Sequence, residues 1–115
     1  MEEKNIEIKN FAVVDRLIQA IKYKKTFDPS KSYVSKLFHE KNDLVLKKFG
    51  EEAIELVLAA KSGSKKKIIS ETADLFFHLL VTLEFCEVKL DDVFEELKTR
   101  EGISGIDEKN SRVPL

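Results

Sequence analysis

Hydrophobic residues recur along most of this chain at helical spacing, in positions three and four apart. The two densest runs occupy residues 43–61 and 65–86, and each is long enough for several helical turns. The same spacing returns more briefly at residues 14–21, 33–38 and 91–100. The alternation typical of strands is weak throughout. The pattern therefore predicts an all-α fold built around two long helices.

The segment between the two long runs has the chemistry of a turn between helices. Ser62 and Gly63 form a stop signal, because glycine commonly follows the last helical residue. Ser64 then offers a hydroxyl that caps the next helix. Since so short a connection makes two helices antiparallel neighbours, we predict a hairpin that turns at Gly63. Ser32 is likewise placed to cap the short helix at 33–38.

Four acidic residues are placed symmetrically about Gly63. Glu55 lies eight residues before this glycine and Glu71 lies eight after it. Glu52 and Asp74 lie eleven before and eleven after. At about 1.5 Å rise per residue, the two pairs stand roughly 12 and 16 Å from the turn. Because the i, i+3 spacing turns both acids of each helix to one side, the hairpin should gather four carboxylates into one cluster.

This cluster has two interpretations, a solvated face or a metal site. On the second long helix, Glu71 and Asp74 share a narrow stripe with His78 and Thr82, and most of the remaining wheel is apolar. A helix this apolar is expected to be buried, so its carboxylates need partners. We therefore favour a metal site for Mg²⁺ or Mn²⁺, ions that prefer oxygen ligands. Its predicted ligands are Glu52, Glu55, Glu71 and Asp74.

Composition and charge narrow the possible partners. The 115 residues suit one domain, 1–115, with a core at about 11–100 and a polar tail at 102–115. Lys and Arg number 20 and Asp and Glu number 21, so no charge excess points to nucleic acid or to membrane. The single cysteine, Cys86, fits a reducing cytoplasm, and we expect it in or near the core. Residues 1–5 do not resemble a signal peptide, and no apolar stretch is long enough to span a membrane.

The two long helices are apolar on most of their sides, and this affects how the protein assembles. Three or four helices in one chain cannot cover every side of residues 44–60 and 68–85. Soluble proteins seldom expose large apolar patches. We therefore expect a homodimer in which two copies form a larger helical bundle, with the metal cluster near the interface.

Basic residues near the acids would complete a site for an anionic ligand. Lys47 and Lys48 lie within two helical turns of Glu52. A lysine is usually just solvated, but lysines beside a carboxylate–metal cluster suit a polyphosphate. His78 is either a substrate contact or a histidine with partners inside the protein. The candidate ligand-binding residues are Lys36, Lys47, Lys48, Lys61 and His78.

Taken in order, these motifs resemble the phosphoribosyl-ATP pyrophosphohydrolases of histidine biosynthesis. The matching segments are KKFGEEAIE at 47–55, AAK at 59–61, ETADL at 71–75, HLLV at 78–81, SYVSKL at 32–37, and GISG, EK and SR within 102–112. The resemblance covers nearly the whole chain, and several ordered motifs make it specific. The wider group, the all-α nucleoside triphosphate pyrophosphohydrolases, shares E-x-x-E followed by E-x-x-D.

The resemblance implies hydrolysis of phosphoribosyl-ATP to phosphoribosyl-AMP and pyrophosphate, the second step of histidine biosynthesis. Metal bound by the four acids would assist the attack of water, with Glu51 or Glu52 as the base and Lys48 holding pyrophosphate. Two alternatives stay open: hydrolysis of other nucleoside triphosphates, and a helical dimer without enzymatic activity. A di-iron bundle is disfavoured, because neither histidine follows a glutamate by three residues.

Overall fold

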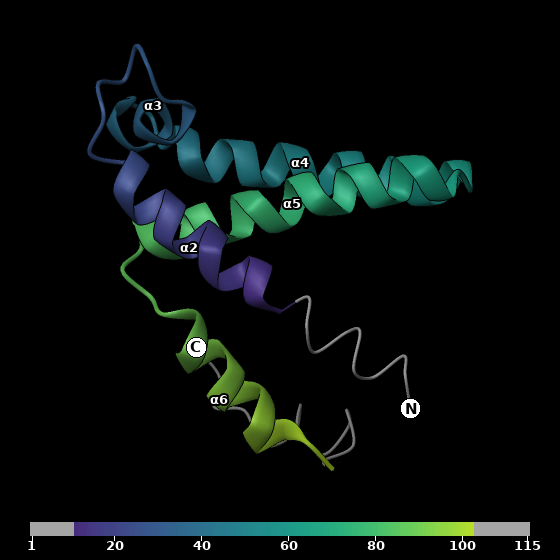
Figure 1. Ribbon diagram of the computed structural model, residues 1–115. Coiled ribbons are helices and arrows are strands. Elements are labelled where there is room, and N and C mark those ends of the chain that lie inside the picture. Colours follow the sequence, from purple (N-terminus) through teal and green to yellow (C-terminus); the bar gives the residue numbers. More distant parts are fainter. Residues whose placement is uncertain (1–10, 103–115) are drawn as a thin grey trace.

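The computed structural model describes residues 11–102, and this part of the chain is entirely helical (Figure 1). Its helices are α2 (Ala12–Lys24), α3 (Tyr33–His39), α4 (Leu44–Ser62), α5 (Lys65–Phe85) and α6 (Leu90–Arg100). The described residues contain no strand, so the predicted all-α class is confirmed. The predicted polar tail lies, beyond Gly102, outside the described residues.

Helices α4 and α5 form the predicted antiparallel hairpin and run side by side along their length (Figure 1). Gly63 follows the last residue of α4 with φ 75°, a left-handed conformation that costs glycine little. The Ser64 hydroxyl then accepts a hydrogen bond of 3.3 Å from the backbone N–H of Lys67 and caps α5. The turn chemistry in the sequence is thus sufficient to end one helix and to start the next.

Short helix α3 is fixed at both its start and its middle. The Ser32 hydroxyl accepts a 3.2 Å hydrogen bond from the backbone N–H of Ser35, as predicted for a capping residue. Ser35 is fully buried, and its hydroxyl donates to the carbonyl oxygen of Phe27. These bonds tie α3 to the loop that precedes it and set the position of Tyr33, the first residue of the helix.

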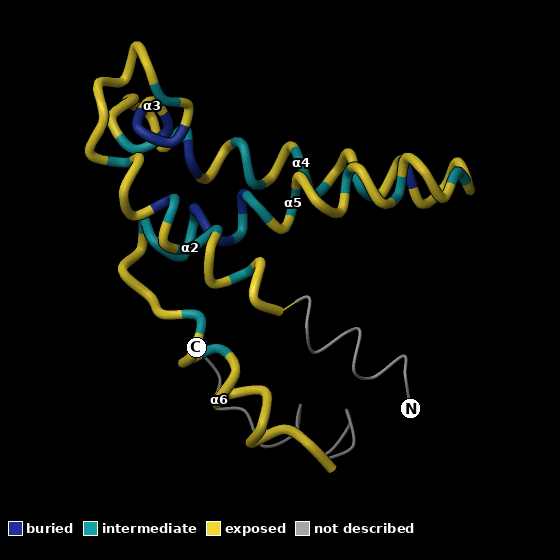
Figure 2. Tube along the Cα trace, in the orientation of Figure 1, coloured by how far each residue is buried: buried dark blue, intermediate teal, exposed yellow. Residues whose placement is uncertain are grey.

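The hydrophobic core lies at one end of the hairpin, where α2 and α3 pack against it (Figure 2). An ion pair closes the side of this core: Lys25 Nζ lies 2.6 Å from a carboxylate oxygen of Glu84. This contact gives a charged partner to Glu84, the one acidic residue of α5 after Asp74. The buried core residues are Ile21, Val34, Leu37, Val45, Leu80 and Val81.

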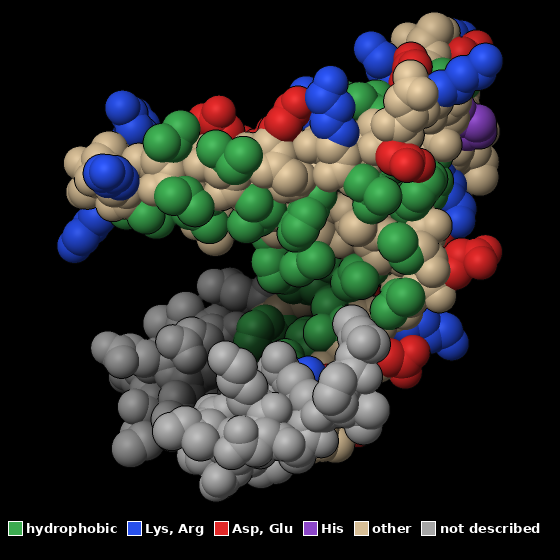
Figure 3. Space-filling model, turned by 180° about the vertical axis from the view of Figure 1, so that it is seen from behind, with side chains coloured by type: hydrophobic (Ala, Val, Ile, Leu, Met, Phe, Trp, Pro, Cys, Tyr) green, Lys and Arg blue, Asp and Glu red, His purple; other side chains and the backbone are tan. Residues whose placement is uncertain are grey.

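Residues 54–73, here called the hairpin arm, extend beyond the core and expose apolar side chains. Figure 3 shows hydrophobic side chains gathered along this arm. Ile54, Val57 and Ile69 expose 62%, 64% and 70% of their surface. A single chain therefore leaves this part of the long helices uncovered, as the sequence indicated, while the homodimer itself stays a prediction.

Two further sequence predictions concern Cys86 and membrane spans. Cys86 is exposed, so its expected place in or near the core was wrong. It follows the last residue of α5, where the chain leaves the core for the loop to α6. Among residues 11–102, no helix is both long and apolar enough to cross a membrane.

Candidate active site

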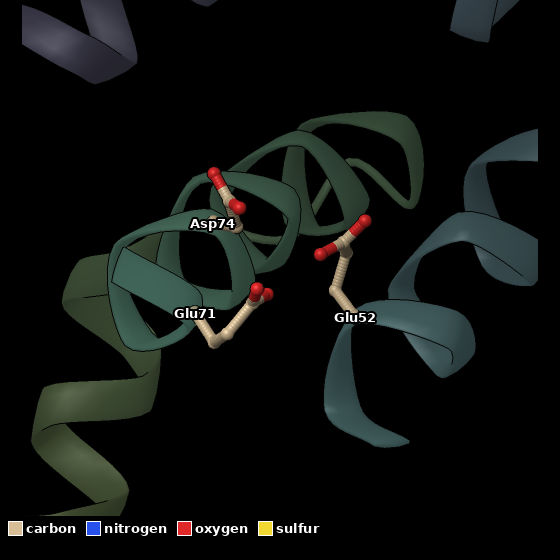
Figure 4. Close-up of side chains that lie close together, drawn as sticks. All are labelled: Glu52, Glu71 and Asp74. Atoms are coloured by element: carbon tan, nitrogen blue, oxygen red, sulfur yellow. The ribbon is translucent and has the colours of Figure 1, made fainter. Parts of the chain in front are cut away.

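Three of the predicted acidic ligands lie together near the middle of the hairpin (Figure 4). Glu52 reaches from α4 toward Glu71 and Asp74, which project from α5. One carboxylate oxygen of each residue lies within 4.8 Å of the other two. The three residues, here called the acid cluster, are separated by up to 22 positions in sequence and meet because the hairpin turns at Gly63.

The register of the hairpin differs slightly from the simple pairing expected from symmetry about the turn. Glu52 approaches both acids of α5 rather than Asp74 alone. Glu55 is not part of this group, although its negative charge acts on Glu71. The predicted role of Glu55 as a ligand therefore stays a prediction, while the other three acids already have the proximity that a shared ion requires.

Electrostatic repulsion within the cluster is visible at Glu71. Partial desolvation raises the pKa of this carboxyl, and the negative charges of Asp74, Glu55 and Glu52 raise its pKa further. Glu52 and Glu71 are half-buried, whereas Asp74 is exposed. The acidic stripe is therefore only partly enclosed within a single chain, with His78 buried, Glu71 half-buried and Asp74 exposed. Its enclosure at a dimer interface stays a prediction.

A hard divalent cation fits this donor set. The cluster offers carboxylate oxygens from two rigid helices, and such ligands suit Mg²⁺ or Mn²⁺ better than softer metals. A cation would also relieve the repulsion that, after desolvation, raises the pKa of Glu71.

Among the predicted lysines, Lys48 forms an ion pair next to the acid cluster. Its Nζ lies 3.4 Å from a carboxylate oxygen of Glu51, one helical turn along α4. This hydrogen bond and the charge of Glu51 raise the pKa of Lys48, with smaller contributions from Tyr33 and Glu52. The exposed residues Lys36, Lys47 and Lys61 stay predictions as ligand contacts.

His78 lies one helical turn after Asp74 on α5 and has protein partners at both ring nitrogens. Its Nδ1 lies 2.8 Å from the backbone carbonyl oxygen of Asp74, so Nδ1 carries the hydrogen. In the neutral ring, Nε2 then accepts a hydrogen bond from the hydroxyl of Tyr33, whose oxygen lies 2.9 Å away. The sequence singled out His78 but gave only a weak signal for Tyr33, because their contact joins residues 45 positions apart.

Tyr33 stands close to the charges of the site. Burial raises the pKa of its hydroxyl first, and the acidic side chains Glu52, Glu51 and Asp74 raise it further, against the opposing effect of Lys48. The hydroxyl therefore keeps its proton and remains a hydrogen-bond donor. Its ring meets the ring of His78 edge to face, with centroids 5.8 Å apart.

Comparison with known proteins assigns the chain to a family. The family described as phosphoribosyl-ATP pyrophosphohydrolase matches residues 14–101. A phosphoribosyl-ATP pyrophosphatase of Nitrosospira multiformis is 49% identical over 100 residues, which cover 87% of this chain and 83% of the relative. A protein of the same name from Dechloromonas aromatica is 47% identical over 100 residues, with 87% and 93% covered. One from Bordetella parapertussis is 55% identical over 85 residues, 74% of each chain.

Proposed function

The chain belongs to the phosphoribosyl-ATP pyrophosphohydrolase family, and from this premise we propose that it hydrolyses phosphoribosyl-ATP to phosphoribosyl-AMP and pyrophosphate. This reaction is the second step of histidine biosynthesis. The observation that carries the proposal is the acid cluster, three carboxylates within 4.8 Å of one another on the two helices of one hairpin. The cluster lies inside the segment that the family matches.

The acid cluster is the proposed metal site. Glu52, Glu71 and Asp74 would hold Mg²⁺, with Glu55 completing the set, and Mn²⁺ would substitute because it accepts the same oxygen ligands. When bound, the ion would neutralise charge on the phosphates and lower the pKa of a coordinated water. The raised pKa of Glu71 is consistent with this role, because desolvation raises it first and the negative charges of Asp74, Glu55 and Glu52 add to the effect.

The remaining side chains would bind and orient the reacting groups. Glu51 or Glu52 would accept the proton of the attacking water. Glu51 is exposed and paired with Lys48, whereas Glu52 belongs to the cluster itself. Lys48 would hold the leaving pyrophosphate together with neighbouring lysines. The proposed supporting lysines are Lys36, Lys47 and Lys61.

We further propose that the protein acts as a homodimer in the cytoplasm. The exposed apolar side chains of the hairpin arm support the dimer, because monomers seldom leave such a surface uncovered. A second copy packed beside the arm would also enclose the acid cluster, in which Asp74 is exposed in one chain. The biosynthetic reaction and the single exposed cysteine suit a reducing compartment.

A product assay tests the proposed reaction. Phosphoribosyl-ATP and Mg²⁺ should give one pyrophosphate per phosphoribosyl-AMP and no orthophosphate. ATP should be a poor substrate, because contacts to the additional phosphoribosyl group help to position the triphosphate. Equal kcat/KM for the two nucleotides would favour the second candidate, a general nucleoside triphosphate pyrophosphohydrolase. Release of orthophosphate alone would contradict both.

A further inference from the structure

His78 is poorly placed to bind a ligand directly, although it lies one helical turn from Asp74. Only 7% of its surface is exposed, and both ring nitrogens are engaged within the protein. Burying a histidine at this point is useful if the ring holds other groups in place. The group that it holds on the solvent side is the hydroxyl of Tyr33.

Tyr33 occupies the boundary between the acid cluster and a neighbouring cavity. Its hydroxyl bonds to the ring of His78, whose Nδ1 bonds to the backbone of Asp74. Tyr33 also lines a cavity of about 290 Å³, together with Phe27 and Phe77. The tyrosine retains 48% of its surface exposed, so one face of it is open to a ligand.

The cavity differs in chemistry from the acid cluster. Its walls are mostly aliphatic and aromatic, with Lys24, Lys31 and Ser32 among the lining residues. Aromatic walls stack well against a heterocyclic base, and ammonium groups suit a sugar phosphate. A nucleotide whose triphosphate binds at the acid cluster could therefore extend past Tyr33 into this cavity.

We propose that Tyr33 contacts the part of the substrate beyond the triphosphate, and that His78 is the positioning residue that holds Tyr33 for this contact. The inference rests on the proposed function and deepens it. The His78 ring joins the backbone of Asp74 to the hydroxyl of Tyr33, so it fixes the distance between the metal-binding carboxylates and the wall of the cavity. Substrate length would be matched to that distance.

Two substitutions at these positions separate the two roles. Tyr33→Phe keeps the ring and removes the hydroxyl that His78 accepts. His78→Asn keeps a donor near the position of Nδ1 and removes the acceptor for Tyr33. A neutral hydrogen bond contributes about 0.5–1.5 kcal/mol, so each variant should raise KM for phosphoribosyl-ATP by about two- to twelvefold, with kcat unchanged. The double variant should be no worse than either single one, because both remove the same bond.

Conservative and matched variants complete the experiment. His78→Gln places an amide oxygen near the position of Nε2 and should restore most of the wild-type KM. Tyr23→Phe removes a hydroxyl from an exposed tyrosine on α2, and His39→Asn alters the exposed histidine of α3. Both controls should leave KM unchanged. If His78→Asn fails to fold, Tyr33→Phe, which alters a half-exposed side chain, decides the question by itself.

A binding measurement separates this inference from the proposed reaction. Phosphoribosyl-AMP carries everything beyond the leaving pyrophosphate, so calorimetric titration without metal reports the contacts assigned to Tyr33. Tyr33→Phe should bind it about two- to twelvefold more weakly than wild type, and Tyr23→Phe should bind it equally well. Wild-type protein that releases no pyrophosphate would overturn the proposed function. Wild-type turnover with unchanged KM and product affinity in Tyr33→Phe would overturn the present inference alone.

Discussion

Ile69 offers the sharpest test of the proposed homodimer, because it is a large apolar residue near the tip of the hairpin and 70% of its surface is exposed. Full burial of an isoleucine side chain contributes about 1.5–3 kcal/mol, so enclosing the exposed part contributes roughly 1–2 kcal/mol per subunit. In a dimer with two-fold symmetry, Ile69 of each subunit contributes this free energy, so the contribution is doubled. Since alanine retains the β-carbon, Ile69→Ala should weaken the dimer by about 1.5–3 kcal/mol, or roughly 10- to 150-fold in Kd.

Sedimentation over a concentration series measures this change. Wild-type protein at micromolar concentration should sediment at twice the 13.2 kDa mass of the chain. Ile69→Ala should shift the dissociation to higher concentration while its helical content stays constant, because alanine favours helix and the site is exposed. The matched control is Leu97→Ala, because 54% of this leucine is exposed and its helix, α6, lies apart from the tip of the hairpin (Figure 1).

The result that would refute the reasoning is a stable wild-type monomer, or a dimer whose Kd responds to Leu97→Ala and not to Ile69→Ala. The first would show that the hairpin arm tolerates solvent, and the second would place the interface elsewhere. Equal Kd values for all three proteins would likewise exclude Ile69 from the interface.

Three other substitutions follow from the acid cluster and the turn. Asp74→Asn removes a charged ligand and should lower Mg²⁺-dependent turnover by more than about 100-fold. The control Asp92→Asn, on α6, should leave turnover unchanged. Near-normal activity of Asp74→Asn would count against the metal site. The pKa of Glu71 in the metal-free folded protein is raised above the ordinary glutamate value of 4.5. Just above pH 4.5 the folded protein therefore binds more protons than the unfolded chain, and the free energy of unfolding should fall as pH rises through that region. Glu71→Gln should remove this slope in thermal unfolding with chelator present, and an unchanged slope would exclude Glu71 as its source. Gly63→Ala should cost about 1–2 kcal/mol in the free energy of unfolding, because φ is 75° although no neighbouring atom crowds the new methyl; an unaltered melting temperature would contradict this strain.

The helical segments and the turn were predictable because they depend on local chemistry. Hydrophobic spacing located all five described helices to within a few residues, and Ser32 and Ser64 act as the caps that the sequence indicated. The proximity of Glu52 to Asp74 followed from equal distances to Gly63 and the fixed rise of a helix. These features need little information from residues far away in the chain.

The tertiary structure decided the features that depend on how helices rotate and pack against one another. Rotation of α4 against α5 sets Glu52 beside both Glu71 and Asp74 and leaves Glu55 outside the closest group. Helix α3 packs against α4 and α2, and this position brings Tyr33 to His78 on α5, a contact that no periodicity encodes. The covering of α5 by α2 stops short of the hairpin arm, so burial could not be inferred from apolar content alone. A sequence fixes the face that each helix presents, but the neighbour that meets this face is chosen by the packing of the whole chain.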